Sequence, residues 1–587
     1  MEETAAPSID SAPLPATAPP SQRWQLLAYA ALIAAAWFAM SLWGLGKVPF
    51  HTKGEPREGL VVWEMTHGGG WVLPMRNGEE VPSKPPLFHW LGALTSIARG
   101  AADEWSIRFP SAALSLLSLW CVLLAGATLW EARAGLLSAL ALMTMFEWAR
   151  SATAGRVDMT LTFGLQAAFL CLLFFLRTRS ARWLTPLYLS IAVAVLGKGF
   201  VGALLPGLVA LAMILLSRDW RLLAEMRLPR GAAIVAAGAG LWYVLALFVG
   251  GSSFFYKQIL GEQLFTFVNN PDFGWKGHRH SLAYLPGALL LGLLPWTPFF
   301  AGVVSSLWRQ RKTLTLKDAR VFLLVWIAVV FVFYQLAAQK RSVYLLALYP
   351  AAALLLGSWW HEQLSQPDRQ ARLATTAQWL GRLLLAVLVP LSVLLFLQSL
   401  GAPLLEWMTP MLSRSARLVL PAIAQAVRDD RAVLGGLLLA SMAALVVVTR
   451  GGRGRDWRMI FAGLALATVA LQLTVRIVFL PAVAQRQTFR EFMREVRSRV
   501  GAQADLRFYK TFEYGAVFYY EGHIPQYKGP WPIDAPRFLL MTASEWEQHP
   551  ETAAVYEKVD LANTLHDKIK DPLLLVRRRD DARRAPQ

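Results

Sequence analysis

The most constraining feature of the sequence is a succession of apolar stretches, each about as long as a membrane is thick. A helix needs roughly 20 apolar residues to cross about 30 Å of hydrocarbon, and such stretches follow one another through most of the chain. We place thirteen spans, at 24–46, 107–130, 134–149, 157–176, 183–197, 199–217, 232–250, 283–304, 320–338, 343–360, 379–400, 432–449 and 459–480. The sequence therefore predicts an all-α polytopic membrane protein with about 13 transmembrane helices.

Composition supports this class and argues against others. Hydrophobic residues make up 55% of the chain, charged residues 17%, and the mean hydropathy is +0.39, whereas soluble domains average about 25% charged residues. The net charge of +19 could indicate nucleic acid, but the basic residues sit in short loops between spans, as in membrane proteins. The two cysteines, Cys121 and Cys171, lie inside spans and exclude a disulfide framework. We expect a lipid bilayer as partner and no nucleic acid.

The distribution of Lys and Arg predicts the orientation. These residues are denser in the loops that follow even-numbered spans, for example Arg309 and Arg311 after the eighth, and basic loops stay in the cytoplasm. The N-terminus is then cytoplasmic, and an odd number of spans places the C-terminus on the outer, periplasmic side. The predicted domains are a disordered tail (1–22), a transmembrane domain (23–484) with a first outer loop at 47–106, and a soluble outer domain (485–587).

The C-terminal region is polar and charged and reads as a small α/β domain. Short strands are expected at Leu506–Phe508, Ala516–Tyr520, Phe538–Met541 and Leu573–Val576, because these runs are rich in β-branched, aromatic and other apolar residues. A helix is expected at Thr488–Val500.

The first outer loop is the most informative stretch. At about sixty residues it is too long for a simple connector. Glu55, Arg57 and Glu58 open an amphipathic segment, an Asn-Gly turn follows, and Lys84 precedes a second amphipathic segment, Leu87 to Ile97. The alternative reading is a re-entrant packing loop whose charges are merely solvated.

Ionisable residues at the ends of spans are further candidates, because charge at membrane depth usually serves function. Asp158 opens the fourth span, Lys198 separates the fifth and sixth, and Lys340 and Arg341 begin the tenth. As alternatives, Asp158 could form an anchoring ion pair with its neighbour Arg156, and Lys198 could simply reach the interface.

The outer face thus gathers both signs of charge. Arg279 lies between two histidines before the eighth span, where no third ligand at a suitable spacing completes a metal site. Cations beside a membrane suit a lipid-linked phosphate, and a carboxylate among them suits a general base. The combination favours group transfer from a polyprenyl phosphate. The cations are Arg57, Lys84, Arg279, Lys340 and Arg341, and the carboxylates are Glu55, Glu58 and Asp158.

Several motifs in series carry a family resemblance. GEPREG, WVLPMRNG and SKPPLFHWLGAL in the first loop are followed by RFPSAALSLL, GRVDMTLTF, GKGFVGALLPGL, LLGLLPWTPFF and KRSVYLLALYP. This order resembles the GT-C membrane glycosyltransferases, in particular the group that contains the lipid A 4-amino-4-deoxy-L-arabinose transferase and the protein O-mannosyltransferases. The resemblance implies a GT-C fold and inverting transfer of a sugar from a polyprenyl-phosphate donor. The reaction would take place at the periplasmic face of the bacterial inner membrane, with lipid A, lipopolysaccharide or another glycolipid or envelope acceptor.

The resemblance also assigns roles and shows a departure. It implies that Arg57, Lys84 and Tyr344 hold the lipid phosphate and that Asp158 is a second acidic group at the cavity. The family's acidic pair at the head of the first loop is here Gly54-Glu55, so the usual catalytic aspartate is replaced by glycine. Either Glu55 is the base, or Asp158 is, or the acceptor is a phosphate that needs none.

The residues alone do not decide whether a divalent metal is bound or which class of protein this is. Ser83 stands where some relatives carry an acidic metal ligand, so a divalent metal is neither required nor excluded. The alternatives are a protein O-mannosyl-type transferase, a transport-related protein, or a non-catalytic relative. Transporters place their charges near the bilayer midplane, whereas the candidates here collect at the outer ends of the spans.

Overall fold

The computed structural model describes residues 20–265, 280–365, 371–407, 409–502, 504–528, 535–561 and 572–579. Most of the predicted tail, 1–22, lies outside these residues and stays a prediction. The first helix, α1, begins at Pro20.

Each predicted span contains at least one helix. Several of the helices begin at an acidic N-cap: the Asp103 side chain accepts a bond from the Ser106 N–H before α4, and Asp456 caps the helix α22. The span helices are α1 (Pro20–Trp37), α4 (Glu104–Leu129), α5 (Ala132–Thr144), α7 (Asp158–Thr178), α8 (Leu184–Lys198), α9 (Val201–Ser217), α11 (Leu228–Val235), α12 (Leu241–Phe254), α14 (Tyr284–Gly292), α15 (Phe300–Gln310), α16 (Ala319–Leu336), α17 (Tyr349–Ser365), α18 (Ala371–Ser399), α21 (Arg431–Gly454) and α22 (Trp457–Thr474).

The predicted number of thirteen spans is not confirmed. Among the described residues, nine helices are long and apolar enough to cross a membrane, and a tenth arises if the bent pair Tyr284–Gly292 and Thr297–Gln310, which meet at 104°, counts as one span. Some predicted spans are not counted because their helices are too short. For example, α5 has 13 residues, which make about 20 Å of helix against about 30 Å of hydrocarbon. It breaks at Met145 and continues as the short helix α6 (Phe146–Ala152).

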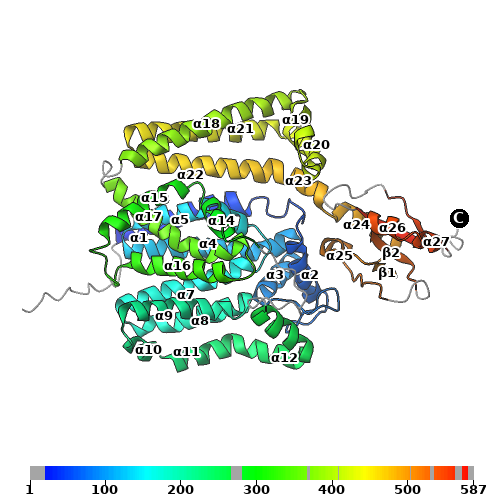
Figure 1. Ribbon diagram of the computed structural model, residues 1–587, viewed down its shortest axis with the longest axis horizontal. Coiled ribbons are helices and arrows are strands. Elements are labelled where there is room, and N and C mark those ends of the chain that lie inside the picture. Colours follow the sequence, from blue (N-terminus) through cyan, green and yellow to red (C-terminus); the bar gives the residue numbers. More distant parts are fainter. Residues whose placement is uncertain are drawn as a thin grey trace, which may run out of the picture.

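Close packing of small residues holds the bundle together. A side chain on Gly126 would come within 2.6 Å of the Gly135 backbone, and one on Gly357 within 2.1 Å of the Ser138 hydroxyl, so these helices approach more closely than larger residues would allow. The helices α18, α21 and α22 form a separate layer along one side of the bundle (Figure 1). Apolar side chains of α18 such as Phe396, 62% exposed, face outward as expected of a lipid-facing surface.

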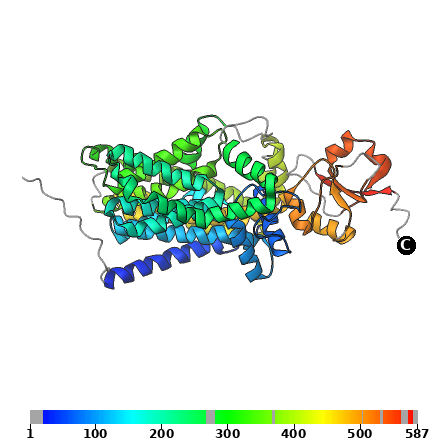
Figure 2. The same cartoon turned by 90° about the horizontal axis from the view of Figure 1, so that it is seen from below.

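One end of the bundle carries the first loop. Its two predicted segments are helices, α2 (Gly54–Thr66) and α3 (Leu87–Arg99), and the Asn77-Gly78 turn has positive φ at both residues, 55° and 74°. Most apolar residues of α2 are buried in the protein, against the C-terminal domain, and do not face the membrane interface. The C-terminal domain extends from this same end (Figures 1 and 2).

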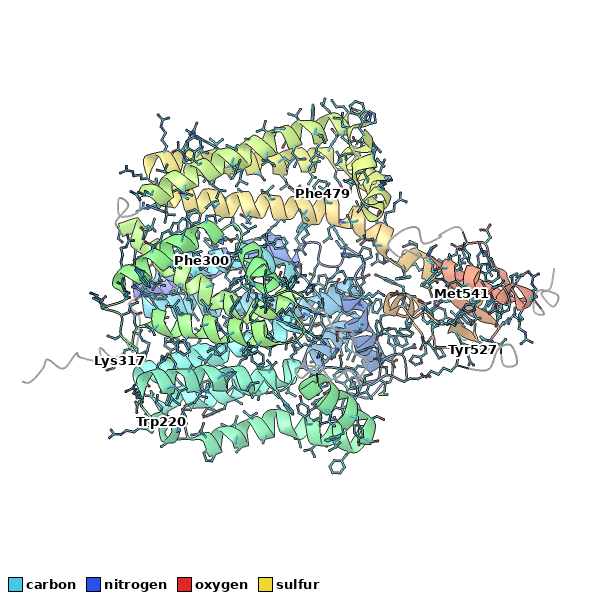
Figure 3. All side chains as sticks on the ribbon, in the orientation of Figure 1. Trp220, Phe300, Lys317, Phe479, Tyr527 and Met541 are labelled. Carbon is cyan, nitrogen blue, oxygen red and sulfur yellow. The ribbon has the colours of Figure 1, made fainter. Side chains whose placement is uncertain are left out.

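The basic loops lie at the other end. Trp220 and Lys317, in two of these loops, lie at one end of the molecule, and Tyr527 and Met541 of the C-terminal domain lie at the opposite end (Figure 3). The predicted sidedness of the loops is thus consistent with the structure, while the assignment of either end to the cytoplasm stays a prediction.

The C-terminal domain is built on a four-stranded sheet in the order β1-β2-β4-β3. Only β1 and β2 are parallel; β4 is antiparallel to both of its neighbours. Two helices, α24 (Arg490–Val500) and α25 (Tyr514–Tyr520), pack against each other beside the sheet. The strands are β1 (Leu506–Phe508), β2 (Phe538–Thr542), β3 (Tyr556–Lys558) and β4 (Leu573–Arg578).

One predicted strand of this domain is wrong. Ala516–Tyr520 belongs to α25, because Ala516, Val517 and Phe518 are buried together on a helix that packs against α2 and α24. The aromatic residues that suggested a strand serve this interface instead. The other three predicted strands are confirmed as β1, β2 and β4, and the predicted helix before them as α24. Strand β3 was not predicted. The domain boundary at residue 485 stays a prediction.

Candidate active site

Glu55, in the first turn of α2, is locked in a buried ion pair. Its two carboxylate oxygens accept bonds from Nε and Nη2 of Arg108, at 2.7 and 3.0 Å, and the Gly155 N–H donates to the carboxylate at 3.0 Å. Burial alone would raise the pKa of Glu55, but the Arg108 charge and these hydrogen bonds outweigh it and lower that pKa. Both oxygens are therefore occupied, and the carboxylate fixes α2 against α4 and the loop before α7.

Glu58, one turn later, holds Arg57 in place. Its side chain is 2% exposed; one oxygen accepts two bonds from Arg57, at 2.9 and 2.6 Å, and the other lies 2.9 Å from Nε2 of the buried His89. Burial raises the pKa of Glu58, and the Arg57 charge together with the His89 hydrogen bond drives it well below its usual value. Glu58 is thus ionised and orients the partly exposed Arg57 guanidinium.

Asp158 is the first residue of α7 and meets Lys198 from the end of α8. The Lys198 ammonium donates to Asp158 at 2.5 Å and lies 4.7 Å from the centre of the Tyr344 ring, which stacks on Tyr334 at 5.1 Å. Gly199 follows Lys198 with φ of 91° and ends α8 there. Asp158 also lies close enough to Glu58 for the two carboxylates to interact electrostatically. The structure therefore places the Asp158–Lys198 pair near the Glu58–Arg57 pair.

A guanidinium fills the position where the resemblance leads one to expect an acidic side chain. The carbon and both terminal nitrogens of the Arg156 guanidinium lie 3.0 to 3.3 Å from where a Cβ on Gly54 would be. The Arg156 Nε is 3.6 Å from Asp158, and the side chain is 28% exposed. Glycine at 54 therefore leaves room for a cation to lie directly against the start of α2.

Lys340 and Arg341 lie beside a second polar cluster. The Lys340 ammonium is buried and donates to the Ala337 carbonyl at 2.9 Å, and in the described part of the chain no carboxylate lies within ion-pair distance of it. The residue after Arg341, Ser342, donates at 3.4 Å to Glu147, which pairs with the half-exposed Arg150 at 2.5 Å.

Two predicted site residues, Lys84 and Arg279, remain. Lys84 lies three residues before α3 and is partly exposed, and Arg279 lies outside the described residues. Within the described ranges no group of three or more His, Cys, Asp or Glu side chains could hold a metal ion, and the divalent metal remains an open expectation.

Several members of the site could not be picked out from the sequence. Arg108 is an isolated charge in an apolar span, a signal that points to function or to a buried partner, and it holds Glu55. His89 lies on the buried face of an amphipathic helix and holds Glu58. Nothing in the spacing of Glu147 and Arg150 distinguished them from an ordinary helix-end pair.

Comparison with known proteins agrees with this architecture. Residues 83–259 match the family model described as dolichyl-phosphate-mannose-protein mannosyltransferase. A Proteus mirabilis protein named undecaprenyl phosphate-alpha-4-amino-4-deoxy-L-arabinose arabinosyl transferase 2 is 24% identical over 312 residues, 52% of this chain and 54% of that protein. A transferase of the same kind from Pseudomonas paraeruginosa is 28% identical over 340 residues, 57% of this chain and 60% of that one. The alignments span only about half the length of these relatives.

The fold likeness extends much further along the chain. The crystal structure of ArnT from Cupriavidus metallidurans bound to undecaprenyl phosphate superposes with a TM-score of 0.70, covering 95% of this chain and 98% of that one at 18% identity. At that identity the match establishes the fold. The chain is a multi-pass membrane protein with an ArnT-like GT-C fold, and its sequence resembles the polyprenyl-phosphate-dependent glycosyltransferases of that class.

Proposed function

We propose that the chain is an inverting glycosyltransferase of the bacterial inner membrane. It takes a sugar from a polyprenyl-phosphate donor and passes it to an envelope glycolipid such as lipid A or lipopolysaccharide. One observation carries the proposal: at one end of the bundle, Arg57 and Lys198 are each oriented by a buried carboxylate, with Tyr344 beside Lys198. Two comparisons support it: ArnT, whose structure shares this fold, holds undecaprenyl phosphate, and the relatives matched by sequence are named undecaprenyl phosphate-aminoarabinose arabinosyl transferases.

The cations bind the donor and stabilise the leaving group. Arg57, Lys84, Lys198 and the Tyr344 hydroxyl hold the phosphate, and the positive charge opposes the negative charge that develops as polyprenyl phosphate departs. Glu58 and His89 keep the Arg57 fork in one orientation, which lowers the entropy cost of binding.

The acceptor attacks from the opposite side of the sugar. Asp158 pairs with two cations and both oxygens of Glu55 accept hydrogen bonds, so neither carboxylate is free to take a proton from an acceptor. Arg156, on the surface that Gly54 leaves open, would instead hold an acceptor that is already an anion. The acceptor oxygen then forms the new bond to the anomeric carbon, the bond to the donor phosphate breaks, and polyprenyl phosphate leaves with that electron pair. No proton moves in this step.

A transfer assay tests the proposal. The protein in nanodiscs receives radiolabelled polyprenyl-phosphate sugars together with a phosphorylated glycolipid or its dephosphorylated counterpart. Label transferred only to the phosphorylated acceptor supports the proposal as stated. Transfer to the hydroxyl acceptor, abolished by Asp158→Asn, would move the reaction toward the protein O-mannosyl type with Asp158 as base. No transfer with any donor contradicts the activity.

A further inference from the structure

The C-terminal domain contacts the first loop through a set of buried and partly buried polar bonds. Asn77 exchanges two hydrogen bonds with the backbone of Ile524, both at 2.9 Å. His523 lies 2.7 Å from Glu64, and the Tyr514 hydroxyl donates to Glu80 at 3.2 Å. The domain is therefore seated on the loop that carries the candidate site.

A further contact of the C-terminal domain leads directly to the site. The Tyr519 hydroxyl, at the end of α25, donates to the Glu104 carboxylate at 2.5 Å and accepts the Phe50 N–H at 2.7 Å. Arg490, from α24, also pairs with Glu104. Burial and the Glu104 carboxylate raise the pKa of Tyr519, so its hydroxyl stays protonated and can donate.

Glu104 and Arg108 are one turn apart on α4. Arg108 lies over the Phe50 ring at 5.0 Å and donates to the Leu45 and Val48 carbonyls and to Glu55. Apolar packing runs parallel to this path: the Phe50 and Phe518 rings are 5.0 Å apart.

The path ends at the proposed acceptor position. Glu55 accepts the Gly155 N–H, and the adjoining Arg156 lies on Gly54 and beside Asp158. A continuous set of contacts thus joins α25 of the C-terminal domain to both sides of the acceptor position.

We propose that Tyr519 is a positioning residue, through which the C-terminal domain sets the first turn of α2 against the start of α7. The domain's role in this chain is then to hold the two halves of the acceptor position at a fixed separation. A displacement of about 1 Å at such a position can cost on the order of a hundredfold in rate. Of the two experiments below, only the kinetic one depends on the proposed transfer activity.

The neighbouring residue supplies a matched control. The Tyr520 hydroxyl donates to the Gly501 carbonyl at 2.7 Å within the same domain, and no hydrogen bond between that hydroxyl and the first loop is present among the described residues. Tyr519→Phe and Tyr520→Phe each remove one hydroxyl from α25, and only the first one removes the hydrogen bonds to Glu104 and to the Phe50 N–H.

The first experiment needs no activity. Amide hydrogen exchange on the full-length protein in nanodiscs compares the two variants with the wild type. Faster exchange in 46–58 in Tyr519→Phe, with Tyr520→Phe unchanged there, is expected. Equal exchange of this segment in both variants overturns the positioning role, whether or not the protein transfers sugar.

The second experiment is kinetic and uses a mutant cycle. Tyr519→Phe is expected to lower kcat about tenfold, as for loss of a hydrogen bond to a charged group, with the donor KM within about twofold and the unfolding temperature close to that of Tyr520→Phe. Combined with Glu55→Gln its effect on kcat should be less than multiplicative, because both changes break one path. Multiplicative effects, or an equal loss of kcat in Tyr520→Phe, overturn the inference. Absence of transfer in the wild type would instead contradict the proposed function and leave the exchange result to decide.

Discussion

Replacing Glu55 by glutamine distinguishes a structural from a catalytic carboxylate. The side chains of Glu55 and Arg108 are 7% and 5% exposed, and the amide would leave the buried Arg108 charge without its ion-pair partner. Breaking a buried ion pair costs about 3–5 kcal/mol. Arg108 keeps its bonds to two backbone carbonyls, so we expect the lower end, about 3 kcal/mol.

The assay is thermal unfolding in detergent alongside transfer activity. Glu55→Gln should lower the unfolding temperature by several degrees and reduce transfer with it. Glu513→Gln is the control, because it breaks the ion pair with the largely exposed Lys53 and should cost less than about 1 kcal/mol. An unchanged unfolding temperature with transfer abolished would refute the structural role and restore Glu55 as the base.

Three further predictions follow from the same geometry. His89→Phe removes the partner of Glu58 and should loosen Arg57, lowering polyprenyl-phosphate affinity about tenfold in a binding assay; unchanged affinity would contradict the orienting role. Stability should fall on acidification, because Glu55 and Glu58 have folded pKa values below the usual 4.5. Their contribution to the free energy of unfolding is present above about pH 4.5 and is lost as the pH falls through the folded pKa values. An unfolding temperature that stays flat from pH 6 to 3 would disagree. Arg156→Gln should raise the acceptor KM about tenfold while leaving the donor KM within about twofold, and Arg156→Lys should recover part of the loss; an unaltered acceptor KM would exclude the contact.

The class of fold could be predicted because the membrane constrains every span in the same way. Each span must bury its backbone hydrogen bonds within a helix and present apolar side chains, and this pattern is legible in the sequence. The number of spans could not be predicted as securely, since α5 and α9 are apolar but short and α14 and α15 bend sharply. Their lengths depend on packing against neighbours.

The candidate site was only partly predictable. Asp158 and Lys198 were found because charge near the end of a span is unusual, and Glu58 because it opens an amphipathic segment in a loop too long for a connector. Their pairings were not, because Arg108 and His89 reach the site from α4 and α3, and contacts between distant segments leave no local pattern. The helix α25 shows the same limit: its aromatic residues favour a strand locally, and contact with α2 decides otherwise.

The central claim is that the charged cluster at the end of the bundle that carries the first loop transfers a sugar from a lipid-linked phosphate. The most direct measurement is transfer of radiolabelled sugar from polyprenyl phosphate by the wild type, Lys198→Met and Lys317→Met, the last being a basic residue at the opposite end (Figure 3). We expect transfer by the wild type and Lys317→Met and at least a hundredfold loss in Lys198→Met, since the donor phosphate loses one of its cations and, of its two described cations, the buried Asp158 keeps only Arg156, at 3.6 Å. Equal transfer by all three, or none by any, would contradict it.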